Sequence, residues 1–527
     1  MPARSPSRSV RRSGLGWFRG AGVLSLALAG CAPGPPPSAP LVVIVVDTLR
    51  ADAVLDPAGT IRTPALASLA EDGALFRRAF SHASLTRPSH AALFSSRLPS
   101  EAGVVGNDDE VSVNLPLVAA WLRDLGYRTA AATSMPTVCG SRPDAGLARG
   151  FELYLRPMVP LRWATRTAQD LTPVVSELDD QEPFFLFAHF ADPHYPYRRH
   201  ASDPARSVSI HFDEELVTRV DPQEPVFEAA EFSLPPGQHE LRFVSEQSFQ
   251  VLHLQLFLNG RRLPYRIVEG ELRKMGGRLV ARIVNRFEAT GRVTMRYACY
   301  DEPDLAESRR RYAEEVDHVD AFVGRLLDAL RARGLYEKAL IVFTSDHGEA
   351  LGEHGLLQHG HNLFDELIHV PLLIKPPAGR EIELARLRER ADTIVSHIDV
   401  VPTVLDLLQL PALPGQRGQS LLDVGRGLHM AEGRRPFADQ DQLCLRDERY
   451  KLVYHTEEER FFLYDLEADP DERVDVFAQR VGERPDWPDL LREIARLGVP
   501  GSDGDAIDPE LEEELRALGY LGGTEDG

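Results

Sequence analysis

The sequence predicts an α/β fold in which a mostly parallel sheet lies between layers of helices. Residues 41–46, 184–190 and 339–344 are apolar throughout, as strands buried on both faces are. Helical patterns separate these runs, and strands alternating with helices are typical of a parallel sheet covered on both sides. The longest helical pattern, from about residue 307 to 333, has one apolar face, made of Val316, Val319, Phe322, Val323, Leu326, Leu327 and Leu330.

Two acidic residues follow strands of this predicted sheet. Asp47 comes directly after the first apolar run, and Asp346 stands two residues after the last. Sites in open α/β sheets collect at the carboxyl ends of the strands, so both carboxylates are expected at one edge. Two shorter helices are expected nearby, at residues 63–71 and 115–125.

The α/β pattern is interrupted between residues 205 and 301. Alternating apolar residues flank a Pro-Pro-Gly turn at 235–237 and run into Asn259-Gly260, which is a strong hairpin signal. The segment is therefore predicted to be an inserted all-β module, a small sandwich. It could bind a glycan, and a packing role explains the pattern equally well.

The C-terminal part is predicted to form a small antiparallel sheet, because residues 449–454 and 461–465 have the pattern of paired strands. The expected organisation is an α/β domain formed by residues 41–204 and 302–435, with the module 205–301 between its two parts. Residues 436–527 form the C-terminal subdomain and tail.

The first residues predict a bacterial lipoprotein signal. A basic region precedes a short apolar run at residues 21–30, and Leu28-Ala-Gly-Cys31 resembles a lipobox in which Cys31 becomes lipidated. A Pro-rich linker follows at residues 32–40 and is expected to act as an extended spacer. These features predict a lipid-anchored protein on the periplasmic or extracellular face of a bacterial cell envelope. A plain cleaved signal within residues 1–31 is the alternative.

Composition restricts the class of partner. The net charge of −21 argues against nucleic acid, whose binding depends on clustered Lys and Arg. An anionic substrate remains compatible, because a bound metal can invert the local field. The remaining cysteines, Cys139, Cys299 and Cys444, have no disulfide or zinc-ribbon spacing and are expected to be small core residues.

Four residues that are distant in the sequence suit one metal site. Asp47, Asp346 and His347 offer two carboxylates and an imidazole, and Thr86 offers a hydroxyl. This donor set fits one divalent ion such as Ca, Mn or Zn. Taken singly, each Asp is better explained as a helix cap or a loop residue.

The motifs that contain these residues resemble the sulfatase family of the alkaline phosphatase superfamily. The resemblance covers residues 41–376 without the inserted module, and the C-terminal strands match the family's usual hairpin domain. The matching motifs occur in the family's order: Asp47-Thr-Leu-Arg-Ala-Asp52, Thr86-Arg-Pro-Ser-His90, Asp192-Pro-His-Tyr-Pro-Tyr197 and Ser345-Asp-His-Gly-Glu349. The resemblance implies an alkaline-phosphatase-like α/β fold and a metal-dependent hydrolase of sulfate or phosphate esters.

The sequence departs from the family pattern at four positions. Thr86 stands where sulfatases have the Cys or Ser that becomes formylglycine, and its methyl group prevents conversion to an aldehyde. His90 replaces the motif's Arg, Ser134 stands in place of one Lys, and His359 stands in place of another. A Thr nucleophile is instead similar to that of the family's phosphotransferase relatives.

The resemblance implies a covalent mechanism. Coordination to the metal would lower the pKa of the Thr86 hydroxyl, whose oxygen would attack sulfur or phosphorus. His194 would protonate the leaving oxygen, and Asn107, His359 and His361 would donate to the non-bridging oxygens. His90 is either part of this machinery or packs behind Thr86.

Three functional hypotheses follow. The first is hydrolysis of a sulfate or phosphate ester, of a small molecule, glycan or lipid, through Thr86. The second is a phosphodiesterase or a phosphoglycerol-type transferase of the envelope, which Thr86 favours. The third is an inactive surface lipoprotein that binds glycans through its β module. A second metal ion at His359 or His361 is a further alternative, whereas His354 is expected to be a loop residue.

Overall fold

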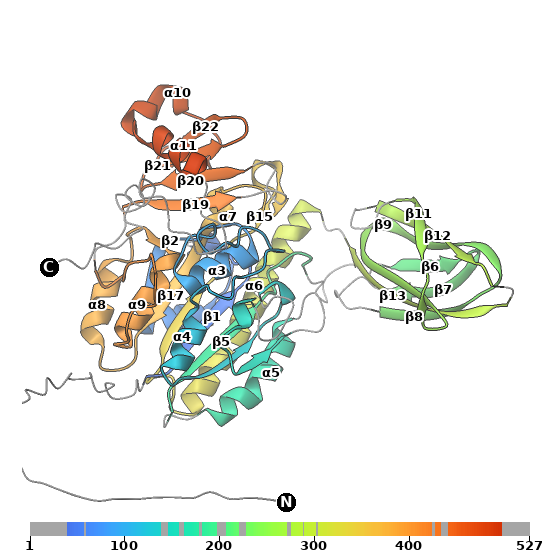
Figure 1. Cartoon of the computed structure of the whole chain (residues 1–527), viewed down its shortest axis with the longest axis horizontal. Coiled ribbons are helices and arrows are strands. Elements are labelled where there is room, and N and C mark those ends of the chain that lie inside the picture. The colour runs from blue at the N-terminus through green and yellow to red at the C-terminus, as the bar shows by residue number, and fades with distance from the viewer. Residues whose placement is uncertain are drawn as a thin grey trace, which may run out of the picture. The chain divides into compact units, whose positions relative to one another are not determined.

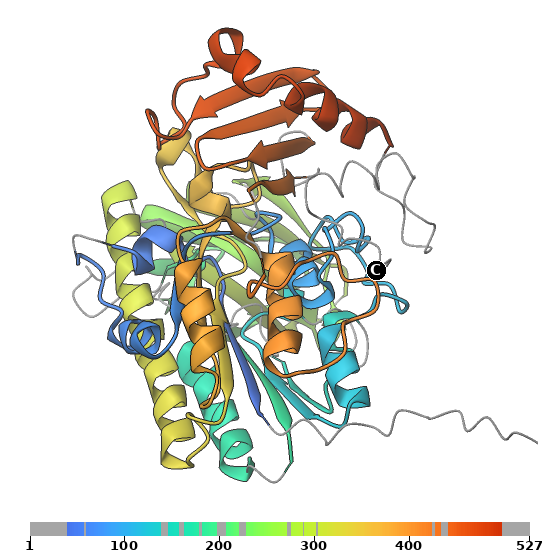
Figure 2. The ribbon, with the colours of Figure 1, turned by 90° about the vertical axis from the view of Figure 1, so that its left-hand side faces the viewer.

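The computed structural model, shown in Figures 1 and 2, leaves several segments undescribed. The predicted signal, Cys31, most of the Pro-rich linker, Cys139 and the C-terminal tail lie outside the described residues. The described residues are 39–56, 59–138, 146–156, 163–178, 182–197, 207–220, 228–270, 276–287, 289–301, 304–423, 427–433 and 441–497.

The core is an eight-stranded mixed sheet in the order β18-β2-β17-β14-β1-β5-β3-β4. Its members are β1 (Leu41–Val46), β2 (Ala74–Phe80), β3 (Arg128–Ala132), β4 (Leu153–Leu155), β5 (Phe184–Phe190), β14 (Leu340–Thr344), β17 (His369–Lys375) and β18 (Val395–Ser396). The central strand β1 is parallel to β14 and β5, as predicted. Only β17 runs antiparallel to its neighbours β14 and β2, so the sheet is mostly parallel.

Helices cover both faces of this sheet, and alternate residues of β1 belong to different cores. Val42, Ile44 and Val46 pack with α2 (Pro64–Asp72), α5 (Ala164–Glu177) and α6 (Leu305–Ala332). Leu41, Val43 and Val45 pack against the opposite helices, α3 (Thr86–Ser95), α4 (Val118–Asp124) and α9 (Val400–Leu407), with α8 (Glu381–Glu389) at the rim. Figure 1 shows α8 and α9 on one side of β17 and β1, and α5 on the other.

Helix α6 confirms the predicted amphipathic helix. All seven apolar residues predicted to share one face are buried. The helix begins where the Asp304 side chain accepts a hydrogen bond from Glu307 N, which caps an otherwise unpaired amide. Among the described residues, no helix has both the length and the apolar character needed to span a membrane.

The described residues between 208 and 301 form strands and their connections, and these strands pair only among themselves. They are β6 (Val208–Phe212), β7 (Glu215–Val220), β8 (Glu228–Leu234), β9 (Gly237–Leu258), β10 (Arg261–Arg262), β11 (Tyr265–Glu269), β12 (Gly276–Asn285) and β13 (Gly291–Asp301). All of their pairings are antiparallel. Asn259 and Gly260 have φ of +49° and +80° and join β9 to β10, as the Asn-Gly signal predicts.

The C-terminal strands form a four-stranded antiparallel meander of β19 (His429–Gly433), β20 (Gln442–Arg446), β21 (Tyr450–His455) and β22 (Arg460–Asp465). The predicted hairpin is the β21–β22 pair. Helix α11 (Trp487–Leu497) packs on this sheet through Leu491 and Ile494, in a core that also contains Ala92 of α3. Figure 2 shows the meander and its helices as one layer.

The remaining elements are short and lie in the connections. They are α1 (Ala51–Val54), α7 (Asp365–Ile368), α10 (Phe477–Arg480), the paired strands β15 (Ala350–Leu351) and β16 (Leu357–Gln358), and 3₁₀ turns at Pro136–Val138, Gly146–Ala148, Glu353–Gly355, His397–Asp399 and Val481–Glu483.

Candidate active site and metal centre

Asp47 and Asp346 come together at the carboxyl edge of the central sheet. Val45 pairs with Thr344 in the β1–β14 ladder, so the two strands end side by side. Both carboxylates are fully buried. Within the described part of the chain, Asp47 Oδ1 and Asp346 Oδ2 accept no hydrogen bond. Buried, unpartnered carboxylate oxygens are costly unless a cation neutralises them.

His347 completes a group of three candidate ligands. One donor atom from each of Asp47, Asp346 and His347 lies within 4.8 Å of the others, and the described residues contain no second group of this kind. His347 Nδ1 lies 2.9 Å from Gly348 O, which can only accept, so Nδ1 carries the hydrogen. Nε2 is therefore left with a lone pair, 3.5 Å from Asp346 Oδ2, as a metal ligand requires.

The electrostatics of the group also fit a cation. Burial opposes ionisation of Asp47, but the nearby imidazoles of His189, His194 and His347 hold its pKa below the ordinary value. Burial and the charge of Asp47 raise the pKa of Asp346 well above its ordinary value. Burial lowers the pKa of His347 to about 3, which keeps the imidazole neutral. A divalent ion would supply the positive charge that neutralises the two buried carboxylates.

Thr86 lies against this group at the first position of α3. Its side chain is buried, and Oγ1 lies 3.5 Å from Asp47 Oδ2 and 3.4 Å from His347 Nε2. The first amides of a helix have no partner within the helix and favour negative charge. The hydroxyl predicted as the nucleophile therefore lies beside the candidate ligands and at a helix end that favours an anion.

Two other predicted residues contact the backbone of this helix start. Asn107 Oδ1 accepts a hydrogen bond from Arg87 N at 2.9 Å, so the amide side chain holds the first turn of α3. His90 Nδ1 donates to Thr86 O at 2.8 Å and lies 3.6 Å from Asp346 Oδ2. His90 is fully buried behind Thr86, the place expected for its packing role.

Two predicted histidines, His359 and His194, approach from two loops. The His359 ring lies 4.5 Å from the His347 ring and 4.9 Å from the His194 ring, between centroids. His194 Nδ1 contacts the carbonyl of Tyr195. His361 is half-buried, and its carbonyl accepts a hydrogen bond from Gln442 Nε2. His354 lies elsewhere, stacked on Phe364 with centroids 3.7 Å apart.

Glu349 belongs to the site but was not predicted to. It ends the motif Ser345-Asp-His-Gly-Glu349, which contains the predicted ligands Asp346 and His347. Its carboxylate is fully buried, with Oε1 3.0 Å from His359 Nδ1 and Oε2 accepting from Tyr195 N at 3.2 Å. It therefore ties the His359 loop to the His194 loop. The acidic residue after Asp-His-Gly was the available signal.

His189 is a second unpredicted residue. It is fully buried at the edge of the site, and Nε2 lies 3.4 Å from Asp47 Oδ2. The sequence signal was a lone imidazole within the otherwise apolar run 184–190.

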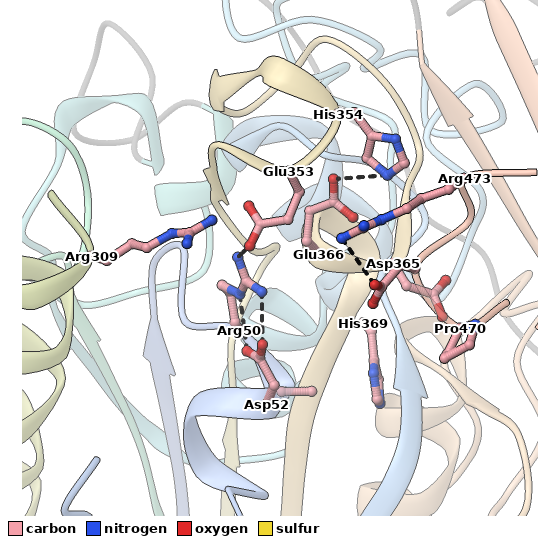
Figure 3. Close-up of a pocket in the computed structure, with 12 residues that line it drawn as sticks. Arg50, Asp52, Arg309, Glu353, His354, Asp365, Glu366, His369, Pro470 and Arg473 are labelled. Carbon is pink, nitrogen blue, oxygen red and sulfur yellow. Dashed lines mark hydrogen bonds and ion pairs between the residues drawn. The ribbon is translucent and has the colours of Figure 1, made fainter. Parts of the chain in front are cut away.

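Arg50, three residues after Asp47, lines the pocket shown in Figure 3. Its guanidinium bonds Glu349 O at 3.1 Å and Glu353 at 3.0 Å, and it also pairs with Asp52. The pocket has a volume of about 300 Å³, and Asp, Glu, Arg and His side chains form most of its lining, among them the half-buried Glu366. It contains none of the residues predicted for catalysis or metal binding.

Comparison with known proteins places this geometry in a family. The family model described as Sulfatase matches residues 40–410, and the one described as N-sulphoglucosamine sulphohydrolase, C-terminal, matches residues 352–484. The chain is 25% identical over 486 residues to choline-sulfatase of Rhizobium meliloti, which covers 82% of this chain and 80% of that protein.

Solved structures share the fold. Phosphonate monoester hydrolase of Agrobacterium radiobacter superposes with a TM-score of 0.57 at 18% identity, covering 87% of this chain and 95% of that one. A protein solved with its substrate D-glucosamine-2-N,6-O-disulfate gives a TM-score of 0.59 at 16% identity, covering 89% and 100%. The alkaline-phosphatase-like α/β fold is thereby confirmed. Because the first family model spans most of the chain, this protein belongs to the sulfatase family and is a sulfuric or phosphoric ester hydrolase.

Proposed function

We propose that the protein cleaves a sulfate or phosphate ester through a covalent intermediate on Thr86. The observation that carries the proposal is the position of Thr86 Oγ1, within 3.5 Å of both Asp47 Oδ2 and His347 Nε2. Both atoms can accept the proton of the hydroxyl, and the N-terminus of α3 favours the negative charge that is left on the oxygen.

Asp47, Asp346, His347 and Thr86 would hold one divalent ion, Ca, Mn or Zn. Such an ion lowers the pKa of a coordinated hydroxyl and screens the charge of an anionic ester. Thr86 Oγ1 loses its proton, attacks sulfur or phosphorus and forms a Thr ester as the bond to the leaving oxygen breaks. Water then cleaves the Thr ester and releases sulfate or phosphate.

His194 is proposed as the acid that protonates the leaving oxygen. Burial lowers its pKa, while the charges of Asp47 and Glu349 act in the opposite direction. An anionic ester bound beside it would add to these charges and favour the protonated imidazole. His359 and His361 would donate to the non-bridging oxygens, with His359 oriented by Glu349. Asn107, through its amide nitrogen, would contribute a further donor, and His90 would fix the Thr86 backbone.

Thr86 favours phosphorus over sulfur as the reacting atom. A Thr side chain cannot become the aldehyde that true sulfatases use, and a direct hydroxyl nucleophile is the mode of the family's phosphotransferase relatives. The protein also resembles a phosphonate monoester hydrolase in fold. Phosphodiester cleavage or phosphoglycerol-type transfer is the second candidate. Aryl sulfate, phosphate, phosphodiester and phosphonate esters, assayed with each metal, distinguish these possibilities.

Thr86→Ala should lose turnover by orders of magnitude, because covalent catalysis has no second route of equal efficiency. Thr86→Ser should keep part of the activity, since the hydroxyl remains. Acid quench during turnover of a phosphate ester should trap a phosphorylated peptide that contains Thr86. A Thr86→Ala protein as active as the parent would show that the nucleophile is water, and the covalent mechanism would be wrong.

We also propose that lipid on Cys31 anchors the protein to a bacterial envelope membrane, facing the periplasm or the exterior, where glycan and lipid esters are available. The support is the lipobox-like sequence and the Pro-rich linker after it. Cys31→Ser should abolish labelling by a radioactive fatty acid and release the protein from membranes or leave its signal uncleaved. Membrane retention without lipid on Cys31 would contradict the anchor.

A further inference from the structure

One outer face of the β module carries arginines that have no acidic partner. The antiparallel register pairs Arg262 of β10 with Phe257 of β9, and Phe257 with Thr294 of β13. Gln255 of β9 pairs with Arg296 of β13 in the next row. Paired residues in antiparallel strands point to the same side of a sheet, so these five side chains share one face.

The alternate residues show that this face points to solvent. Leu254, Leu256, Leu258, Val293 and Met295 are buried in the core of the module. Gln255, Arg262 and Arg296 are exposed, whereas Phe257 and Thr294 are half-buried. We call the set Gln255, Phe257, Arg262, Arg292, Thr294 and Arg296 the arginine face.

The charge of the arginine face is only partly neutralised. Arg292 forms an ion pair with Glu231 on the neighbouring strand β8. Arg296 lies over the Phe257 ring, 5.6 Å from its centroid. Within the described residues, neither Arg262 nor Arg296 forms an ion pair with an acidic side chain. Two guanidinium groups therefore keep a net positive charge beside the side chain of Gln255. The Thr294 hydroxyl donates to Glu231 at 3.4 Å.

The net charge of the module differs from that of the rest of the chain. Residues 207–301 contain thirteen acidic and twelve basic residues, whereas the whole chain has a net charge of −21. Nearly all of the excess negative charge therefore lies outside the module. A polyanion is repelled by most of this protein and can approach the module most easily.

We propose that the arginine face binds a sulfated polysaccharide. Guanidinium groups bind two oxygens of a sulfate or carboxylate through paired N–H donors, and the amide of Gln255 can hydrogen-bond to sugar hydroxyls. A membrane surface fits less well, because the large exposed apolar residues of the module, Leu216, Val268, Val284 and Phe287, are not on this face. That the bound polymer is also a substrate is a separate consequence, which rests on cleavage of sulfate esters within the proposed function; binding by the face does not require it.

Polysaccharide binding can be measured without enzyme activity. The test therefore remains decisive even if the proposed catalytic function is wrong. The full chain is titrated with heparin, dextran sulfate and uncharged dextran, and with vesicles containing anionic lipid. We expect binding to heparin and dextran sulfate only. Arg262→Ala combined with Arg296→Ala should weaken heparin binding by about tenfold or more. The slope of log Kd against log salt concentration should decrease by about one for each arginine removed.

The matched control removes two other exposed arginines of the module, Arg266→Ala and Arg286→Ala, which lie off the arginine face. It should keep heparin affinity within about twofold, since it changes the net charge equally but leaves the site intact. Equal losses in both double variants would overturn the site, as would undiminished binding by the Arg262/Arg296 variant. Absence of heparin binding, equal binding of uncharged dextran, or preferential binding to vesicles would each overturn the proposal as well. Melting curves of both variants verify that they are folded.

Discussion

His189 Nε2 lies 3.4 Å from Asp47 Oδ2, and both side chains are fully buried. The β1–β5 register pairs Val45 with His189 and so brings the imidazole to the end of β1. Ser134 N donates to His189 Nδ1 at 3.3 Å, which leaves the ring hydrogen on Nε2. The imidazole can therefore donate to Asp47 and fix the direction of that carboxylate.

We expect His189→Leu to weaken divalent metal binding by about 10–100-fold, the usual effect of losing a group that orients a metal ligand. His189→Gln should retain part of the affinity, because the amide nitrogen can replace Nε2 as the donor. Isothermal titration with Mn²⁺ and Zn²⁺ measures this without turnover.

His455→Leu is the control, since it makes the same change in the half-buried end of β21. Its metal affinity should equal that of the parent. If His189→Leu also binds metal as tightly as the parent, His189 does not position Asp47.

The candidate ligands could be predicted because their signals are local. Two apolar strands are each followed closely by an Asp, and parallel strands end at a common edge. The partners of those ligands could not be predicted in the same way. His189 and Ser134 reach the site through the order β14-β1-β5-β3, and no local pattern specifies which strands become neighbours.

The ends and directions of helices and strands could also be predicted only in part. The strands 41–46 and 184–190 match β1 and β5, because buried parallel strands are apolar throughout. Helix α4 begins at Val118 rather than near residue 115, after Pro116, whose presence disfavours helix in the residue before it. The antiparallel direction of β17 depends on the path of the chain through residues 345–368, which periodicity does not reveal.

Asp346→Asn should stabilise the metal-free protein and abolish its stabilisation by metal. Burial and the charge of Asp47 make ionisation of Asp346 costly, so a neutral Asn at this position relieves that cost in the metal-free state. Metal then has one ligand charge fewer, and binding should weaken strongly. Melting temperatures with EDTA and with added metal test both parts. Loss of stability with EDTA together with unchanged metal-induced stabilisation would contradict this role of Asp346.

Glu366 should make stability decrease as pH rises. Burial raises the pKa of this carboxyl from 4.5 to about 7, and its Oε1 has no hydrogen-bond partner within the described residues. The groups facing it are His354, Glu353, Lys451 and Arg50. A folded-state pKa above the unfolded one means that the folded protein binds more protons, so stability is lost between about pH 4.5 and 7.

Glu366→Gln should therefore match the parent near pH 4.5 and exceed its unfolding free energy by about 1–3 kcal/mol near pH 8. Urea unfolding at a series of pH values measures the difference. The exposed Glu389→Gln on α8 serves as the control and should show no pH-dependent difference. A Glu366→Gln curve parallel to that of the parent would refute the assignment.

Lys451 joins the C-terminal sheet to α7 through buried charges. Its side chain is fully buried, and Nζ lies 2.9 Å from both Asp365 Oδ1 and Glu472 Oε1. Burial alone would lower the pKa of Lys451, but these carboxylates raise it above the ordinary value. Removing one partner of a buried ion pair leaves the other charge uncompensated.

We therefore expect Lys451→Met to lower the free energy of unfolding by about 3–5 kcal/mol. Adding Glu472→Gln should recover part of this loss, because one of the two stranded carboxylates is then neutral. Arg460→Ala, at the exposed end of β22, should cost less than about 1 kcal/mol in the same urea titration. If Lys451→Met costs no more than Arg460→Ala, the buried charges do not hold the C-terminal sheet to α7. Additive effects of Lys451→Met and Glu472→Gln would likewise show that the two side chains are not coupled.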